Sequence, residues 1–284
     1  MYPRKFDYMA PETLDEAIAA LAANPGAKVL AGGQSLLTMM KTRLVSPELV
    51  IDINGIQGLD QIDEHGDYIA IGALVRHAET AASPLIQDHA PALAQAASMT
   101  GDAQVRNRGT TCGSLAHADI AADQPAAALA LGAKMVAMSP SGSREIPASS
   151  FFVDTLTSAL TPDEILVELR VPKGGTSAYD KLGRRGGHSD YAVAGSAAWV
   201  QKSNGTVEAA RVGITGVGTR PSLATSVADA IVGTDGSAAA VAAAAEHATD
   251  GVTVLEDLYG TEEYKAHLAQ VYVGRALRAA LSSG

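Results

Sequence analysis

The first third of the chain alternates short aliphatic runs with amphipathic helical segments, and this alternation limits the possible folds more than any other feature of the sequence. Thr13 and Glu16 form a capping box, and apolar residues at helical spacing follow it until Asn24-Pro25-Gly26 ends the predicted helix. The same stretch favours an α/β arrangement, with strands and helices in turn. A second helix is predicted for residues 34–44, and strands are predicted for residues 28–31, 49–53 and 68–72.

A second region of the chain begins after residue 171. The strand-like run 165–171 is followed directly by a proline and two glycines, so residues 171–177 are the strongest linker candidate. Asn204 and Gly205 predict a type I′ hairpin between two strand-like runs. Three helical patterns end the chain, the last over residues 261–281.

Composition excludes several classes of function. The chain has 284 residues, 47% of them hydrophobic and only 4% aromatic, so we expect a packed core of small aliphatic side chains. Its 21 basic and 31 acidic residues give a net charge of -10, which argues against nucleic acid as a partner. We find neither a signal segment nor a run of about 18 apolar residues, and we expect a cytoplasmic protein with no transmembrane segment.

The single cysteine, Cys112, rules out an internal disulfide. One thiol also cannot hold an iron-sulfur cluster or a structural zinc ion, so any metal redox centre must belong to another chain. No neighbouring residue argues for a reactive thiolate, and we expect Cys112 to be buried and inert. The seven histidines form no ligand set, and His117 is expected to have a packing or hydrogen-bonding role.

The first segment that could carry chemistry is residues 29–36, where a strand enters two glycines and then a helix. Such a turn presents unpaired N–H groups at the positive end of a helix, and glycine lets a phosphate approach the backbone. The segment fits neither the dinucleotide fingerprint with its three spaced glycines nor the phosphate loop that ends in Lys and Ser or Thr. A diphosphate cradle and an ordinary strand-to-helix turn both remain open.

The second segment covers residues 106–123 and follows a predicted helix at residues 91–99. Three hydroxyls lie around Gly109 and Gly113, as expected of a polar, glycine-rich loop that wraps a ligand with backbone amides and short donors. Asp119 and Asp123 could accept hydrogen bonds from such a ligand. Either carboxylate could equally cap the helix predicted over residues 123–132.

The third segment, residues 179–194, contains a basic trio that is unusual in so acidic a chain. Lys181, Arg184 and Arg185 precede Asp190 and Tyr191, which stand at the start of an apolar run. Lysine and tyrosine here could contact a planar ligand. A solvated basic turn before a strand accounts for the same residues.

Taken together and in this order, the three segments resemble the FAD-binding medium subunit of molybdenum hydroxylases, the family that includes carbon monoxide dehydrogenase medium chains and the flavin domain of xanthine dehydrogenase. The resemblance covers essentially the whole chain and rests on residues 31–36, 108–123 and 179–194. It departs from many family members at Cys112, where they carry a second glycine, and at Ile120, where they carry a proline.

The resemblance implies an α+β fold in two parts. Residues 1–174 would form an FAD-binding domain of two subdomains that divide near residues 55–60. Residues 175–284 would form a smaller C-terminal domain with a three-stranded antiparallel sheet and helices. No catalytic residue and no metal ligand is implied in this chain.

The resemblance also implies which residues contact FAD. Backbone amides from residues 31–35 would hold the diphosphate, and residues 110–114 would form a second wall. Asp123 would bind the flavin or its polar chain, Lys181 would lie near the pyrimidine edge of the isoalloxazine, and Tyr191 would lie beside the ring. The complete set implied is Ala31, Gly32, Gly33, Gln34, Ser35, Thr100, Thr110, Thr111, Gly113, Ser114, Asp123, Leu166, Lys181 and Tyr191.

The function implied is electron transfer in a heteromeric oxidoreductase. A large molybdopterin-binding subunit would oxidise the substrate, a small subunit with iron-sulfur clusters would relay electrons, and FAD would pass them to a terminal acceptor. The assembly implied is a dimer of heterotrimers, and its substrate, whether CO, an aldehyde, a purine or another N-heterocycle, is left open. Two other hypotheses are a non-redox α/β scaffold and a stand-alone flavin oxidoreductase.

Overall fold

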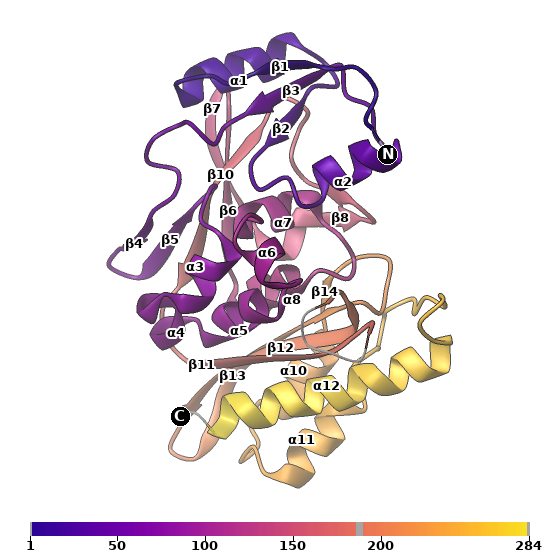
Figure 1. Cartoon of the computed structure of the whole chain (residues 1–284). Coiled ribbons are helices and arrows are strands. Elements are labelled where there is room, and N and C mark those ends of the chain that lie inside the picture. Colours follow the sequence, from indigo (N-terminus) through magenta and orange to yellow (C-terminus); the bar gives the residue numbers. More distant parts are fainter. Residues whose placement is uncertain (1, 186–189, 283–284) are drawn as a thin grey trace.

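Sheets with helices packed against them follow one another from the top to the bottom of Figure 1. The computed structural model describes residues 2–185 and 190–282. The uppermost sheet is parallel, in the order β1 (Asp7–Met9), β3 (Leu49–Asp52), β2 (Lys28–Leu30). The predicted alternation of strand and helix is therefore confirmed for this N-terminal part.

The first two helices begin and end largely as the sequence predicts. α1 (Leu14–Ala23) starts at the predicted capping box, where the N–H of Glu16 donates to the Thr13 hydroxyl at 3.2 Å. α2 (Leu36–Thr42) is shorter than predicted, because Gly33 at φ 73° precedes it and Arg43 at φ 62° ends it in the left-handed region. The turn between β2 and α2 is thus formed by residues 31–35, the first glycine segment.

The central sheet is antiparallel and carries hydrophobic layers on both faces. Side chains alternate along it, so that Met135 and Ala137 pack toward the helices while Val136 packs toward α1 and β3. A bulge between Leu166 and Glu168 interrupts this register. The strand order is β4 (Ile62–Glu64), β5 (Tyr68–Gly72), β10 (Ile165–Pro172), β6 (Lys134–Ser139), β7 (Gly142–Pro147).

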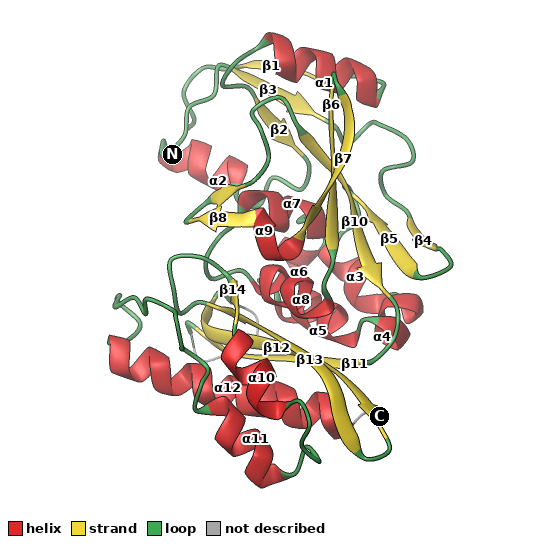
Figure 2. Ribbon diagram, turned by 180° about the vertical axis from the view of Figure 1, so that it is seen from behind, coloured by secondary structure: helices red, strands yellow, loops and turns green. Residues whose placement is uncertain are grey.

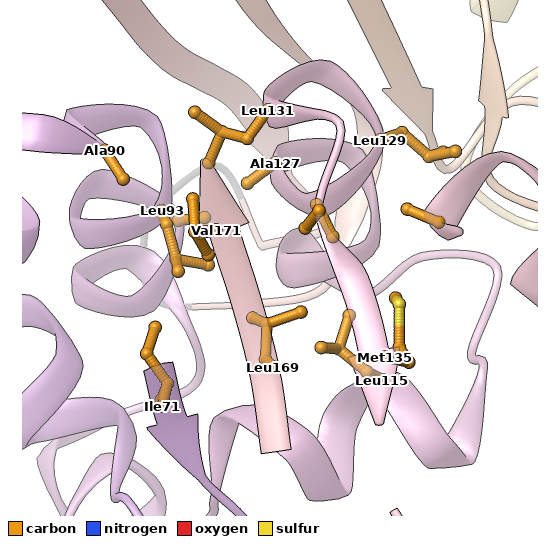
Figure 3. Packing of buried hydrophobic residues seen from close by; sticks show 14 of the residues in the cluster. Ile71, Ala90, Leu93, Leu115, Ala127, Leu129, Leu131, Met135, Leu169 and Val171 are labelled. Carbon is orange, nitrogen blue, oxygen red and sulfur yellow. The ribbon is translucent and has the colours of Figure 1, made fainter. Parts of the chain in front are cut away.

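A layer of helices lies between the central sheet and the C-terminal sheet. All nine residues of α8 are buried, and Figure 3 shows Leu131 of this helix on the side of Leu93 and Val171, with Leu129 on the opposite side. Small side chains make this double-sided packing possible, since alanine lets the sheets approach the helix closely. The helices of the layer are α3 (His77–Ala82), α4 (Pro84–His89), α5 (Pro91–Met99), α6 (Ala103–Arg106), α7 (Thr111–His117) and α8 (Asp123–Leu131).

The polar stretch at residues 101–114 is not the open loop that its composition predicts. It contains α6 and the start of α7, and Asp102 and Thr110 act as their N-caps. The hydroxyl and carboxylate groups that suggested a loop satisfy the first N–H groups of these two short helices. After β7 the chain continues through α9 (Ala148–Phe151) to the small pair β8 (Phe152–Asp154) and β9 (Thr157–Ser158).

The C-terminal sheet is covered by helices on both faces (Figure 2). One face packs on α5 and α8, and the other on α10 (Thr225–Ile231) and α12 (Glu262–Ser282), against which α11 (Ala238–Ala245) packs in turn. The predicted hairpin is confirmed, with Asn204 at φ 51° and Gly205 at φ 81° as a type I′ turn requires. The sheet order is β11 (Thr176–Gly183), β12 (Ala192–Ser203), β13 (Thr206–Thr215), β14 (Ser222–Leu223), so the predicted three antiparallel strands gain a two-residue fourth.

The predicted linker lies between β10 and β11, where Gly174 and Gly175 both have positive φ. The chain does not separate into independent cores here, because Tyr179 and Ala197 share a hydrophobic cluster with Leu93 and Leu129. Among the helices that the structure describes, none combines the length and apolarity needed to cross a membrane.

Candidate functional site

The two glycine segments, far apart in sequence, lie in direct contact. A Cβ atom added to Gly32 would lie 2.4 Å from the carbonyl oxygen of Arg108 and 2.6 Å from Cα of Gly109. Both are backbone atoms, so no side-chain movement could relieve the clash. Glycine at position 32 is therefore required for the first segment to touch the second.

Main-chain donors are free along both segments. Among the described residues, no acceptor is bonded to the N–H groups of Gly32, Gly33, Gln34 and Ser35, which precede α2. In the second segment the N–H groups of Thr110 and Cys112 are likewise without a protein acceptor in the described part of the chain. Six N–H groups on two adjoining turns could thus donate to an anionic ligand such as a diphosphate.

The hydroxyls of the second segment are bonded within the protein. Thr110 accepts the N–H of Gly113 at 3.1 Å, the Thr111 hydroxyl lies 2.7 Å from that of Thr80, and Ser114 donates to Gln124 at 2.9 Å. Ser114 thus uses its O–H within the protein, whereas Thr110 only accepts, so its O–H stays available as a donor beside the main-chain N–H groups.

Asp123 is the centre of a buried polar network behind the two turns. Its carboxylate accepts from Lys181 at 2.7 Å, from Tyr179 at 2.5 Å and from Thr100 at 3.3 Å. Gln124 continues the network by donating to the Thr100 hydroxyl at 2.7 Å. Burial raises the pKa of Asp123, and the charge and hydrogen bond of Lys181 oppose that rise. Burial and the Asp123 charge also raise the pKa of Tyr179 well above its usual value.

Lys181 is enclosed by carbonyl and carboxylate oxygens from three parts of the chain. Its side chain is 0% exposed, and its amine donates to Asp123, to the Met99 carbonyl at 3.0 Å and to the Asp190 carbonyl. The resemblance implies that Lys181 lies near the flavin, and the structure shows that its amine forms a buried ion pair between α8 and β11. Asp123 begins α8 but does not cap it, since Ala122 is the N-cap.

Tyr191 brings the third segment to the first. The residue is 41% exposed, its phenol lies close to Ser35, and the guanidinium of Arg184 lies 5.3 Å from the ring centroid. Burial of the phenol raises the pKa of Tyr191. Residues 186–189 of the predicted segment lie outside the described residues.

The remaining predicted residues occupy the core. Leu166 is buried between the central sheet and the helices, in one cluster with Cys112 and Leu115. Cys112 is buried as expected, and burial raises the pKa of its thiol to about 12. The structure therefore unites residues 31–35, 110–114 and Tyr191 around the turns, with Thr100, Asp123 and Lys181 behind them.

Sequence reasoning missed several polar residues that support the site. Asn54, Arg76 and His77 belong to no motif, and each stands alone in a turn or at a helix start. Tyr179 lies inside the third segment, but nothing in the sequence indicates that its phenol bonds to Asp123. These residues can be recognised only from their contacts with segments that are distant in the sequence.

Comparison with known proteins shows to which family the chain belongs. Residues 4–174 match the model of the FAD binding domain in molybdopterin dehydrogenase, and residues 177–280 match that of the CO dehydrogenase flavoprotein C-terminal domain. The carbon monoxide dehydrogenase medium chain of Hydrogenophaga pseudoflava is 41% identical, over 99% of this chain and 98% of its own. The 6-hydroxypseudooxynicotine dehydrogenase complex subunit alpha of Paenarthrobacter nicotinovorans is 37% identical over 99% of this chain and 96% of its own.

Solved structures give the same result. A structure of reconstituted CO dehydrogenase from Oligotropha carboxidovorans superposes with a TM-score of 0.96 at 32% identity, covering 100% of both chains. A carbon monoxide dehydrogenase structure from Hydrogenophaga pseudoflava superposes with a TM-score of 0.95 at 42% identity over 99% of both chains. The chain therefore belongs to the family of FAD-binding medium subunits of molybdopterin dehydrogenases, and it is a subunit of an oxidoreductase.

The residues present fit the cofactor of this family. FAD carries a diphosphate, and the free N–H groups before α2 and at the start of α7 supply donors for an anion. Gly32 lets the two turns lie against each other, so that their N–H groups can serve one ligand, and the Tyr191 ring lies close to Ser35.

Proposed function

We propose that this chain binds FAD across its two glycine turns and passes electrons from the iron-sulfur clusters of a partner subunit to a terminal acceptor. The observation that carries the proposal is the row of N–H groups from Gly32 to Ser35, which have no acceptor among the described residues and lie against the second glycine segment. FAD, when bound, supplies both one-electron and two-electron chemistry, which suits a relay between single-electron carriers and an acceptor.

In this proposal some of the predicted residues contact FAD, and the others support the residues that do. Residues 31–35 and the main chain of residues 110–114 hold the diphosphate, and Tyr191 lies beside the isoalloxazine. Thr100, Asp123 and Lys181 support this wall from behind through their buried network. Leu166 supports the wall from the core, packed with Cys112 and Leu115.

The partners proposed are a large molybdopterin-binding subunit and a small iron-sulfur subunit, assembled as a dimer of heterotrimers. The names of the relatives support this, since they are medium chains or lettered subunits of larger enzymes. With Cys112 as its single, buried cysteine, this chain cannot supply cluster ligands itself. The domain division at residues 174 and 175, the subdomain division near residues 55–60 and a cytoplasmic location belong to the same proposal.

Absorption spectroscopy of the purified chain tests the cofactor. Oxidised flavin absorbs near about 450 nm as a property of the cofactor itself. A bound flavin that is released as FAD on denaturation supports the proposal. A preparation that is colourless after incubation with FAD and removal of the unbound cofactor would favour the scaffold hypothesis.

Co-purification from the native host tests the partners. We expect a large and a small subunit to travel with this chain, and flavin reduction by substrate to need both. Reduction of the isolated chain by an organic substrate, with turnover to an artificial acceptor, would instead support a stand-alone flavin oxidoreductase.

A further inference from the structure

Asn54 links the first glycine segment to the rest of the protein. Its side-chain amide donates to the Ala31 carbonyl at 2.8 Å and to Asp52 at 2.6 Å. Its side-chain oxygen accepts from the guanidinium of Arg76 at 2.7 Å. Asn54 is half-buried and follows β3, so its position is set by the parallel sheet.

Arg76 links Asn54 to the second glycine segment. One of its terminal nitrogens donates to Asn54, and the other donates to the Arg108 carbonyl at 2.7 Å. The backbone of Arg76 is itself fixed, because its N–H donates to Glu79 at 2.7 Å and it forms a β-bridge with Thr110. A continuous chain of three hydrogen bonds thus joins the Ala31 carbonyl to the Arg108 carbonyl.

This chain of bonds controls the direction of a free donor. In a trans peptide the carbonyl and the following N–H point in opposite directions. Asn54 holds the Ala31 carbonyl, so it also orients the N–H of Gly32, which is free in the described part of the chain. Arg76 holds the Arg108 carbonyl, the atom that a Cβ at Gly32 would strike. The planar guanidinium fixes both ends at once because its donors form a rigid fork.

We propose that Asn54 and Arg76 act as one positioning unit that sets the spacing and orientation of the two backbone walls of the FAD site. The proposal rests on the proposed function, since it concerns the same cradle. Neither side chain needs to touch the cofactor. Their effect on binding comes from the two carbonyls that they hold.

Binding of FAD to full-length variants tests this unit. We expect Arg76→Met to raise the FAD dissociation constant by about tenfold to a hundredfold, since hydrogen bonds from a charged group hold both walls. Asn54→Ala should act similarly. The double variant should weaken binding by little more than the stronger single variant, because the two residues form one chain.

Arg211→Met is the matched control. The Arg211 guanidinium also donates to backbone carbonyls, those of Ala130 and Leu131, but these lie at the end of α8. We expect it to lower the unfolding temperature of the FAD-free chain at least as much as Arg76→Met does, with no more than about a twofold change in FAD affinity. A loss of stability in both variants, with a loss of FAD affinity in Arg76→Met alone, would show that Arg76 positions the site and does more than stabilise the fold.

Three results would overturn the proposal while wild-type protein still binds FAD. They are an unchanged dissociation constant in Arg76→Met, equal weakening in Arg211→Met, and single effects that multiply fully in the double variant. Wild-type protein that fails to bind FAD would instead overturn the proposed function.

Discussion

The amine of Lys181 lies 2.7 Å from a carboxylate oxygen of Asp123, inside the protein and across the boundary between the two family domains. Their side chains are 0% and 3% exposed. A buried pair of this kind is costly to break from one side, because the remaining charge is left without a partner.

Lys181→Met should therefore destabilise the chain by about 3–5 kcal/mol. Urea unfolding of the FAD-free protein measures this. Lys134→Met is the control, since Lys134 pairs with Glu145 at the surface and its loss should cost less than about 1 kcal/mol. Adding Asp123→Asn to Lys181→Met should recover part of the loss, and an unchanged unfolding midpoint in Lys181→Met would contradict the buried pair.

Stability should fall as the pH drops from about 6.5 to 4, in part because of His77. Burial lowers the pKa of His77 to about 4 from 6.5, and its Nδ1 accepts from Gln124 at 3.1 Å. Between these values the unfolded chain binds a proton that the native chain does not, so unfolding becomes more favourable as the pH falls. The full contribution is on the order of 3 kcal/mol.

Unfolding free energies of wild type and His77→Asn, measured from pH 7 to pH 4, isolate this contribution. Asparagine keeps an acceptor but cannot take up the proton. The variant should lose distinctly less stability over that range. Parallel curves would show that His77 is not the titrating group.

Gly32→Ala should destabilise the chain by about 1–3 kcal/mol and lower its FAD content, because the new methyl group meets backbone of Arg108 and Gly109. Thermal unfolding and flavin absorbance measure the two effects. Gly66→Ala is the control, since nothing lies within 4 Å of its Cβ position and its φ is not in the left-handed region. A Gly32→Ala protein as stable as Gly66→Ala would refute the close contact.

Gly33→Asp should weaken FAD binding by at least about tenfold, because it places a negative charge at the diphosphate turn. Gly33→Asn is the matched control. It meets the same φ of 73° and the same contacts with Leu30 and Leu37, but adds no charge. Fluorescence titration with FAD compares them, and equal affinities for the two variants would argue against a diphosphate at this turn.

The elements with strong local signals could be predicted from the sequence. The capping box at Thr13 and the Asn204-Gly205 turn fix backbone geometry through neighbouring residues, and both are as expected. The short helices α6 and α7 cannot be predicted in this way, because Asp102 and Thr110 favour helix caps and loops equally until the N–H groups that they bind are located.

The candidate site was predictable only as three separate segments. Glycines at 32 and 33 indicate an open turn, but the contact of Gly32 with Arg108 depends on how distant parts of the chain pack. The same limit applies to Lys181. Its position among basic residues suggests an accessible cation, and only the tertiary structure shows that Met99, Asp123 and Asp190 surround its amine.

The ion pair between α8 and β11 also has a consequence for dissecting the molecule. A cut between Gly174 and Gly175 would leave Asp123 on one fragment and Lys181 on the other, so that each charge would lose its partner. Separation of the fragments would also expose the apolar side chains that they share in one core cluster. Co-expressed halves should consequently reassociate, whereas either half produced alone should aggregate, so truncation is a poor route to a minimal flavin carrier.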